Sequence, residues 1–259
     1  MSYSAIMVEK KDAVAVITLN RPPFNPLNSQ VFKELALAAE ELEADSEIRA
    51  VVVTGAGEKA FAAGADINEM KGLTPVEMHK FSRVSSRAYS AIENMTKPTV
   101  AALNGLTLGG GCELALVCDL RLAADTAKIG LPEINLGIFP GGGGTQRLPR
   151  LIGAGRAKEM MFLGEMIDAG QAEKYGLVNR MVPASSLMEE ALALAVKLSR
   201  KAPVALGLLK GTINTGLNTD LPSAIESEGK SFIVAFASDD RQEGFNAFAE
   251  KRQPNFSGK

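Results

Sequence analysis

Apolar residues along this chain follow two patterns, short runs that favour strands and longer stretches with helical spacing. The short runs are rich in valine, isoleucine, alanine and threonine, and glycine or asparagine often follows them. They predict strands at residues 13–20, 50–54, 99–104 and 120–123. Residues 28–44 place apolar side chains at helical spacing behind an Asn-Ser pair that can cap a helix. Strands that alternate with helices indicate an α/β fold.

Helical spacing alone continues from about residue 185 to the end of the chain. The predicted helices, which proline, glycine or paired aspartates separate, cover residues 185–200, 203–217, 221–237 and 240–250. We predict a boundary near residue 200, with residues 1–200 forming an α/β core that holds the active site and residues 201–259 forming a helical segment. The apolar stripes of this segment must be buried against the core or against a neighbouring subunit.

The composition is that of an ordinary globular protein with a substantial core: 259 residues, 46% hydrophobic and 22% charged, with a net charge of −2. No block is dense in lysine and arginine, so a nucleic-acid partner is not indicated. The first residues do not resemble a signal peptide, and no apolar run approaches the ~20 residues that span a bilayer. Only two cysteines are present, Cys112 and Cys118, and their spacing matches no zinc motif. A reduced, cytoplasmic location without membrane contact is the expectation.

Side chains that commonly carry nucleophilic or metal chemistry are scarce. The single histidine, His79, lies in a polar helical stretch, which favours a solvated surface position. No G-x-S-x-G turn is present, and no cluster has the spacing of metal ligands. The chemistry is therefore expected to rest on carboxylates, backbone amides and bound substrate, without a metal.

Two glutamates, Glu113 and Glu133, stand beside turns rich in glycine or marked by proline. Their apolar neighbours favour partial burial, which raises the pKa of a carboxyl group toward the range useful for acid–base work. The glycine run at 109–111 precedes a helical stretch and can bring backbone N–H groups close to a developing oxyanion. A glycine run alone more often marks a tight turn. A further glycine turn at 61–67 and the adjacent glutamates favour the functional interpretation.

Several long motifs occur in an order that resembles the enoyl-CoA hydratase (crotonase) family, over nearly the whole chain. They are residues 60–67, 102–115, 132–137 and 140–147. The resemblance, which is to the short-chain enoyl-CoA hydratase type, implies a crotonase-type spiral of repeated ββα turns. It also implies that a C-terminal helical segment mediates trimer assembly, and that two trimers commonly stack into a hexamer.

The resemblance also implies roles for residues of the site. The backbone N–H groups of Ala65 and Gly110 would form the oxyanion hole for the thioester carbonyl. Glu113 and Glu133 would be the catalytic pair, and we assign Glu113 as the base toward water and Glu133 as the acid toward C2. The N–H of Gly141 would help to hold the catalytic water.

The same resemblance implies an extended groove for coenzyme A, with its adenine near the turn at 63–65. The residues implied to bind coenzyme A are Ala63, Ala65, Asp66, Ile67, Phe232 and Lys251. The last two would close the groove, sometimes from a neighbouring subunit, although Lys251 is equally well explained as a solvated surface lysine. Asn68 departs from the pattern, because many relatives carry a lysine there near the phosphates.

The implied activity is reversible addition of water across the 2,3 double bond of a trans-2-enoyl-CoA, giving 3-hydroxyacyl-CoA, or the reverse dehydration. Coenzyme A belongs to the substrate, so no separate cofactor is expected, and the chain is expected to be a homotrimer or homohexamer. An isomerase, a dienoyl-CoA hydratase and a thioester hydrolase remain alternatives within the family. A non-catalytic RNA-binding relative is the alternative from another class. Core packing is favoured over an acyl pocket for Met70, Met78, Met160 and Met161.

Overall fold

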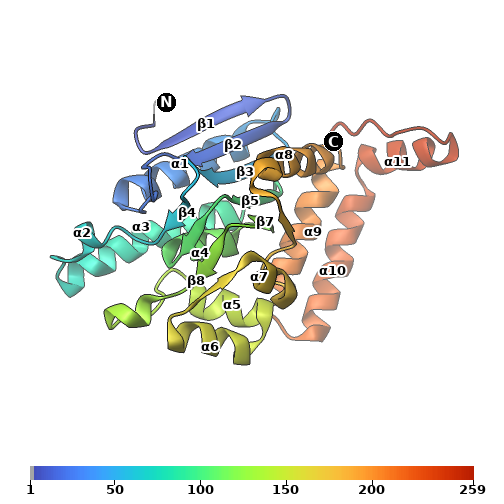
Figure 1. Cartoon of the computed structure of the whole chain (residues 1–259). Helices are drawn as coiled ribbons and strands as arrows, with labels where there is room; N and C mark the ends of the chain where they lie inside the picture. The colour runs from blue at the N-terminus through green and yellow to red at the C-terminus, as the bar shows by residue number, and fades with distance from the viewer. Residues whose placement is uncertain (1–2) are drawn as a thin grey trace.

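Two β-sheets form the centre of the computed structural model, which describes residues 3–259 (Figure 1). The first sheet has the order β1-β2-β3-β5-β7-β10 and is parallel except for the pair β1 and β2. Its strands are Ile6–Lys11 (β1), Val14–Leu19 (β2), Ala50–Gly55 (β3), Thr99–Leu103 (β5), Leu120–Ala124 (β7) and Arg180–Val182 (β10). The second sheet, β4-β6-β8-β9, comprises Ala60–Ala63 (β4), Leu106–Leu108 (β6), Lys128–Gly130 (β8) and Met166–Asp168 (β9).

The chain winds between these sheets as a spiral. β3, β5 and β7 are neighbours in the first sheet, and the strand that follows each of them, β4, β6 or β8, lies in the second. Helical segments after β4 and β6 lead the chain back to the first sheet, whereas the helical segment after β8 leads to β9 of the second sheet, and α7 then leads to β10 of the first. The predicted α/β spiral of ββα turns is therefore confirmed.

Helices cover the sheets and pack on one another. They are Ser29–Ala44 (α1), Ile67–Met70 (α2), Pro75–Glu93 (α3), Gly110–Val117 (α4), Gly144–Ile152 (α5), Ala154–Leu163 (α6) and Ala169–Tyr175 (α7), with short 3₁₀ helices at Glu133–Leu136 (η1) and Ala184–Ser186 (η2). Of the two predicted capping candidates, Asn28 and Ser29, Asn28 is the cap, because its side chain accepts the N–H of Val31. Phe32 of α1 contacts Phe81 and Tyr89 of α3 edge to face, which joins the two helices through buried aromatic rings.

The sequence pattern identified the first sheet better than the second. Strands expected at 13–20, 50–54, 99–104 and 120–123 correspond to β2, β3, β5 and β7. The strands β4, β6 and β8 were not predicted, because each has only three or four residues and little apolar alternation. His79 is exposed on α3, as expected.

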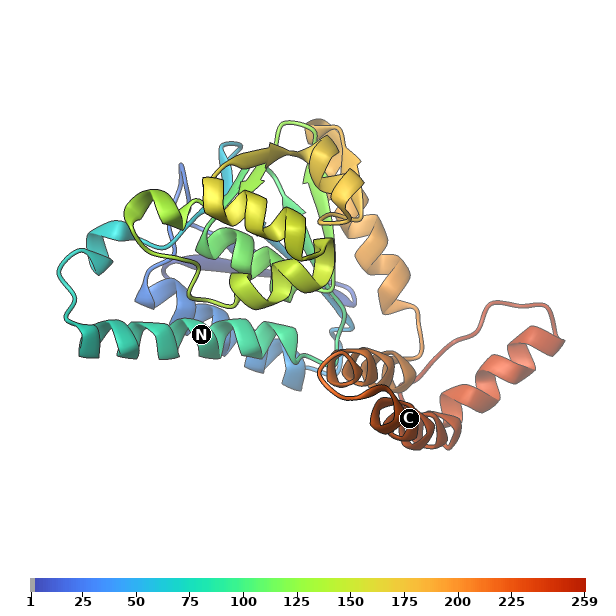
Figure 2. The same ribbon diagram turned by 90° about the horizontal axis from the view of Figure 1, so that it is seen from below.

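Four helices end the chain at one side of the molecule: Leu187–Ser199 (α8), Pro203–Gly216 (α9), Leu221–Phe236 (α10) and Asp239–Ala249 (α11). They match the four helices predicted there. α8 packs on β3 and β5, whereas α9 and α10 lie against each other and neither buries a residue. Figure 2 shows α11 extending away from the sheets. The division of the chain near residue 200 stays a prediction.

Across residues 3–259, no helix combines the length and the apolar character needed to cross a membrane.

Candidate active site

Three strands of the second sheet, β4, β6 and β8, end side by side. They are parallel, and Leu108 at the end of β6 pairs with the last residue of each neighbour, so the three strand ends are in register. Ala65, Gly110 and Glu133 each follow one of these ends by two or three residues. Because the carboxyl ends of adjacent parallel strands lie at one edge of a sheet, the fold brings these residues together.

The N–H groups of Ala65 and Gly110 form one part of this site. A methyl group placed on Gly110 would lie 3.5 Å from the amide nitrogen of Ala65. Within the described part of the chain, neither N–H donates to a protein carbonyl or side chain. Gly109 adopts φ = 51°, a backbone conformation that favours glycine, and thereby begins α4 at Gly110. Two neighbouring unpaired amides are the arrangement that an oxyanion requires.

Glu113 lies in the first turn of α4 and is 4% exposed. Its Oε1 accepts the N–H of Gly142 at 2.7 Å and the N–H of Gly144 at 2.8 Å. Burial raises the pKa of this carboxyl above its usual value, while the two N–H donors and the charge of Arg147 lower it. The N–H donors stabilise the ionised form, which is the form that a general base requires.

Glu133 begins η1 and is half-buried. Burial raises the pKa of its carboxyl to about 7, and the negative charge of Glu113 adds to the rise. Its Oε2 is a buried oxygen that has no hydrogen-bond partner among residues 3–259. A methyl group on Gly109 would lie 3.1 Å from Oε1 of Glu133, so this carboxyl lies beside the turn that starts α4. Near neutral pH, Glu133 can hold a proton and donate it.

The glycine turn 141–144 passes over Glu113 at contact distance. A Cβ on Gly142 would lie 2.5 Å from Oε2 of Glu113, and one on Gly144 would lie 3.1 Å from Oε1. These two positions need glycine because the backbone itself contacts the carboxylate. Gly141 is exposed, and nothing lies within 4 Å of where its Cβ would be. Gly141 directly precedes Gly142, whose N–H bonds Glu113, and the role of its own N–H in holding water stays a prediction.

Tyr89 and the donor role of Gly142 and Gly144 were not predicted from the sequence. The buried hydroxyl of Tyr89 donates to the carbonyl oxygen of Gly110 at 2.9 Å. An aromatic residue at helical spacing is typical of a core position, so no local signal marked Tyr89. The glycines lay within the recognised motif, but only the fold shows that their N–H groups bind Glu113.

The residues expected to bind coenzyme A fall into two groups. Ala63 ends β4 and Ile67 begins α2, so both lie beside Ala65. The carboxylate of Asp66 caps α2 and pairs with Arg21 at 2.9 Å.

Phe232 and Lys251 form the second group, and the fold of one chain does not bring them to the glutamates. Phe232 lies on α10, and Lys251 follows α11, which extends away from the sheets (Figures 1 and 2).

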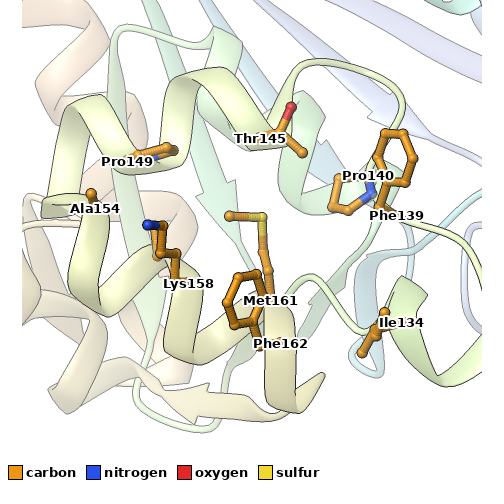
Figure 3. Close-up of a pocket in the computed structure, with 10 residues that line it drawn as sticks. Ile134, Phe139, Pro140, Thr145, Pro149, Ala154, Lys158, Met161 and Phe162 are labelled. Atoms are coloured by element: carbon orange, nitrogen blue, oxygen red, sulfur yellow. The ribbon is translucent and has the colours of Figure 1, made fainter.

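A cavity of about 300 Å³ opens between η1, α5 and α6. Figure 3 shows its mostly apolar lining, with Lys158 the one charged side chain there. Ile134 and Pro140, which adjoin Glu133 and Gly141 in sequence, are among the residues that line it. Met161 also lines this cavity, whereas Met160 is buried in the core.

Met70 and Met78 pack against the core, as expected. Within residues 3–259, no group of three or more His, Cys, Asp or Glu side chains is arranged to hold a metal ion.

Comparison with known proteins matches residues 9–259 to the family described as enoyl-CoA hydratase/isomerase. A short-chain-enoyl-CoA hydratase of Clostridium acetobutylicum is 45% identical over 254 residues, which cover 98% of this chain and 97% of the relative. A crotonyl-CoA hydratase of Syntrophomonas wolfei is 42% identical over the full length of both chains. The crystal structure of an enoyl-CoA hydratase from Bacillus anthracis superposes with a TM-score of 0.96, at 40% identity, over 99% of this chain and all of that one.

The ββα spiral, with paired amides and two glutamates at one sheet edge, defines a protein of the crotonase fold. The chain belongs to the enoyl-CoA hydratase/isomerase family, as the sequence motifs predicted.

Proposed function

We propose that this protein is an enoyl-CoA hydratase that adds water reversibly across the 2,3 double bond of a trans-2-enoyl-CoA. The observation that carries the proposal is that the unpaired N–H groups of Ala65 and Gly110 lie in one site with two glutamates. One glutamate accepts backbone N–H donors, and the other has a buried oxygen that accepts none from the described residues. Relatives named as hydratases, 42–45% identical over almost the full length, support this activity.

In the proposed reaction, the N–H groups of Ala65 and Gly110 bind the thioester oxygen. Water bound at the N–H of Gly141 attacks C3, and Glu113 takes its proton as the new C–O bond forms. The π electrons of the double bond move onto the thioester oxygen as an enolate, which the two amides stabilise. The enolate then collapses, and C2 takes the proton of Glu133.

The substrate thus carries its own coenzyme A, and the reaction needs no redox group or metal. We propose that the coenzyme A moiety lies along the turn formed by Ala63, Ala65, Asp66 and Ile67. Asn68 places an uncharged amide where a lysine would contact phosphate, which weakens the attraction at this point. In this proposal Phe232 and Lys251 act on the site of a neighbouring subunit, since α10 and α11 carry them away from their own.

We also propose a trimer, or two stacked trimers, located in the cytoplasm. The faces of α9 and α10 support assembly, because neither helix buries a residue within one chain. Large apolar side chains exposed on them include Leu209, Ile213, Ile225, Phe232 and Ile233.

The test is loss of the enoyl absorbance when the protein is mixed with crotonyl-CoA. The variants Glu113→Gln and Glu133→Gln are each expected to lower kcat/KM by about 10²–10⁴-fold, because an amide keeps the shape but exchanges no proton. Circular dichroism should show both variants folded like the wild type. A folded variant with wild-type turnover would remove that glutamate from the mechanism. Conversion of 3-enoyl-CoA without hydration of crotonyl-CoA would identify an isomerase instead.

A further inference from the structure

We propose that the ion pair between Arg147 and Glu93 is a positioning device for Glu113. It holds the glycine turn 141–144 around the Glu113 carboxylate and places a fixed positive charge beside it. The proposal rests on the proposed hydratase function, in which Glu113 is the base.

The contacts form a continuous chain from helix α3 to the carboxylate. Nε of Arg147 donates to Oε1 of Glu93 at 2.7 Å, and Nη2 donates to Oε2 at 2.6 Å. Nη1 donates to the carbonyl oxygen of Gly142 at 3.1 Å, and the N–H of the same glycine donates to Glu113 at 2.7 Å. Gly142 is thus held at both its carbonyl and its N–H. The two-point bond to Glu93 fixes the orientation of the guanidinium plane.

The backbone of the turn fits around this guanidinium. Gly143 adopts φ = 105°, which favours glycine, and a Cβ there would collide with Nη1 of Arg147. The turn therefore leaves room for an arginine and none for a side chain of its own. This fit is independent of the hydrogen bonds and leads to the same role for Arg147.

Helix α3 links both halves of the site through one face. Glu93 and Tyr89 are four residues apart, which places them on the same side of the helix. Tyr89 bonds the carbonyl of Gly110 at the start of α4, while Glu93 holds Arg147 above the glycine turn. A single rigid helix therefore sets the distance between the oxyanion amides and the base.

The charge of Arg147 also favours the ionised form of Glu113, as the geometry of the turn does. The titratable groups that face Glu113 are Cys112 on its own helix, Tyr89 on α3, Glu133 in η1 and Arg147 on α5. Burial raises the pKa of Tyr89 and of Cys112, so both stay neutral. Arg147 is the one positive charge among these groups, and it lowers the pKa of Glu113. Its removal is expected to make Glu113 harder to ionise.

The experiment compares four variants: Arg147→Gln, Arg147→Lys, Glu93→Gln and the control Arg87→Gln. Arg87 also lies on α3 and pairs with Glu40 at 2.8 Å, but both side chains are at least half exposed. Its replacement by glutamine therefore makes the same change in net charge at a solvent-exposed ion pair. Carbon-13 NMR of labelled glutamate, assigned by comparison with Glu113→Gln, follows the titration of Glu113 without substrate. The pH profile of crotonyl-CoA hydration follows its ionisation in turnover.

We expect Arg147→Gln to move the Glu113 titration and the acidic limb of kcat/KM to higher pH, with a fall on the order of tenfold in kcat/KM at the acidic end. Arg147→Lys keeps the charge but loses the two-point bond, so it should keep the titration and lose kcat. Glu93→Gln should lower kcat without moving the titration to higher pH, since Arg147 keeps its charge. The control should resemble the wild type in both measurements.

The proposal is overturned if Arg147→Gln titrates and turns over like Arg87→Gln. If Arg147→Gln does not fold, Arg147→Lys decides, and wild-type kcat in that variant rejects positioning by the ion pair. A protein that fails to hydrate crotonyl-CoA, yet shows the shifted Glu113 titration in Arg147→Gln, would reject the proposed function and retain the electrostatic link.

Discussion

At the scale of single residues, the two glutamates are distinguished by what their oxygens contact. Glu113 receives two backbone N–H donors on one oxygen, whereas one buried oxygen of Glu133 has no partner in the part of the chain that the structure describes. Donors stabilise a carboxylate, and burial without donors stabilises the protonated acid. Paired carboxyl groups whose surroundings separate their pKa values commonly divide acid and base roles. The structure thus gives a physical reason for assigning the base to Glu113 and the acid to Glu133.

The first prediction from this difference concerns the pH profile. Because the pKa of Glu133 is raised to about 7, kcat/KM for hydration should fall as the pH rises through about 7, where the free enzyme loses the acid. The two groups interact, so the measured midpoint belongs to the pair. Initial rates with crotonyl-CoA from pH 5 to 9 measure this limb. A value of kcat/KM that is constant up to pH 9 would argue against Glu133 as the proton donor.

A second prediction concerns stability. The pKa of Glu133 is higher in the folded protein than in the unfolded chain, so ionising it disfavours folding. The contribution of Glu133 to the free energy of unfolding should therefore be fully present below the usual carboxyl pKa near 4.5 and be lost as the pH rises through about 7. Glu133→Gln carries no charge and should gain thermal stability relative to the wild type at pH 8 but not at pH 4. Calorimetry at both pH values checks this, and equal differences at the two would refute it.

At the scale of elements, the sequence predicted helices and strands that have a local apolar pattern. It did not predict strands that form only by pairing with distant segments. The helix at 28–44 has a cap and an apolar stripe, so its bounds were readable. β4, β6 and β8 are short, and only pairing between segments about 20 to 45 residues apart makes them strands. Glu113 and Glu133 could be predicted as site residues because sequence motifs surround them. The role of Glu93 could not be predicted, because only the folded position of α3 places it against Arg147.

The glycine turn gives a prediction at this scale. Gly142→Ala would place a methyl group 2.5 Å from Oε2 of Glu113, so the turn must move and its N–H bond to Oε1 must weaken. We expect hydration to fall by one to two orders of magnitude, in line with the loss of one well-placed N–H donor (~10²–10³-fold) partly relieved by movement of the turn. Gly155→Ala on α6 is the matched control, because nothing lies within 4 Å of its Cβ position. Similar kcat values for both variants would show that the turn adapts without consequence.

At the scale of the whole molecule, the C-terminal helices carry many large apolar side chains that one chain leaves exposed. α9 and α10 bury no residue, and α11 buries only Asp240 and Ala247. The carboxylate of Asp240 accepts the N–H groups of Ser257 and Gly258, which ties the last residues to α11. Three ordered helices thus expose apolar faces in the single chain. We expect another subunit to cover these faces.

Assembly is therefore the last prediction. Light scattering should give about three or six times the 27.3 kDa of one chain, and a mass near 27.3 kDa would reject a trimer. Ile225→Asp, at a side chain 57% exposed on α10, should reduce that mass with little effect on the fold of a single chain, because the aspartate meets water there in the monomer. Val76→Asp, at a side chain 67% exposed on α3, is the matched control and should leave the mass unchanged.

If Phe232 and Lys251 act on a neighbouring site, Ile225→Asp should also raise KM for crotonyl-CoA at protein concentrations where the variant is monomeric. An unchanged KM in a demonstrated monomer would remove both residues from the coenzyme A site while leaving the roles of Glu113 and Glu133 intact.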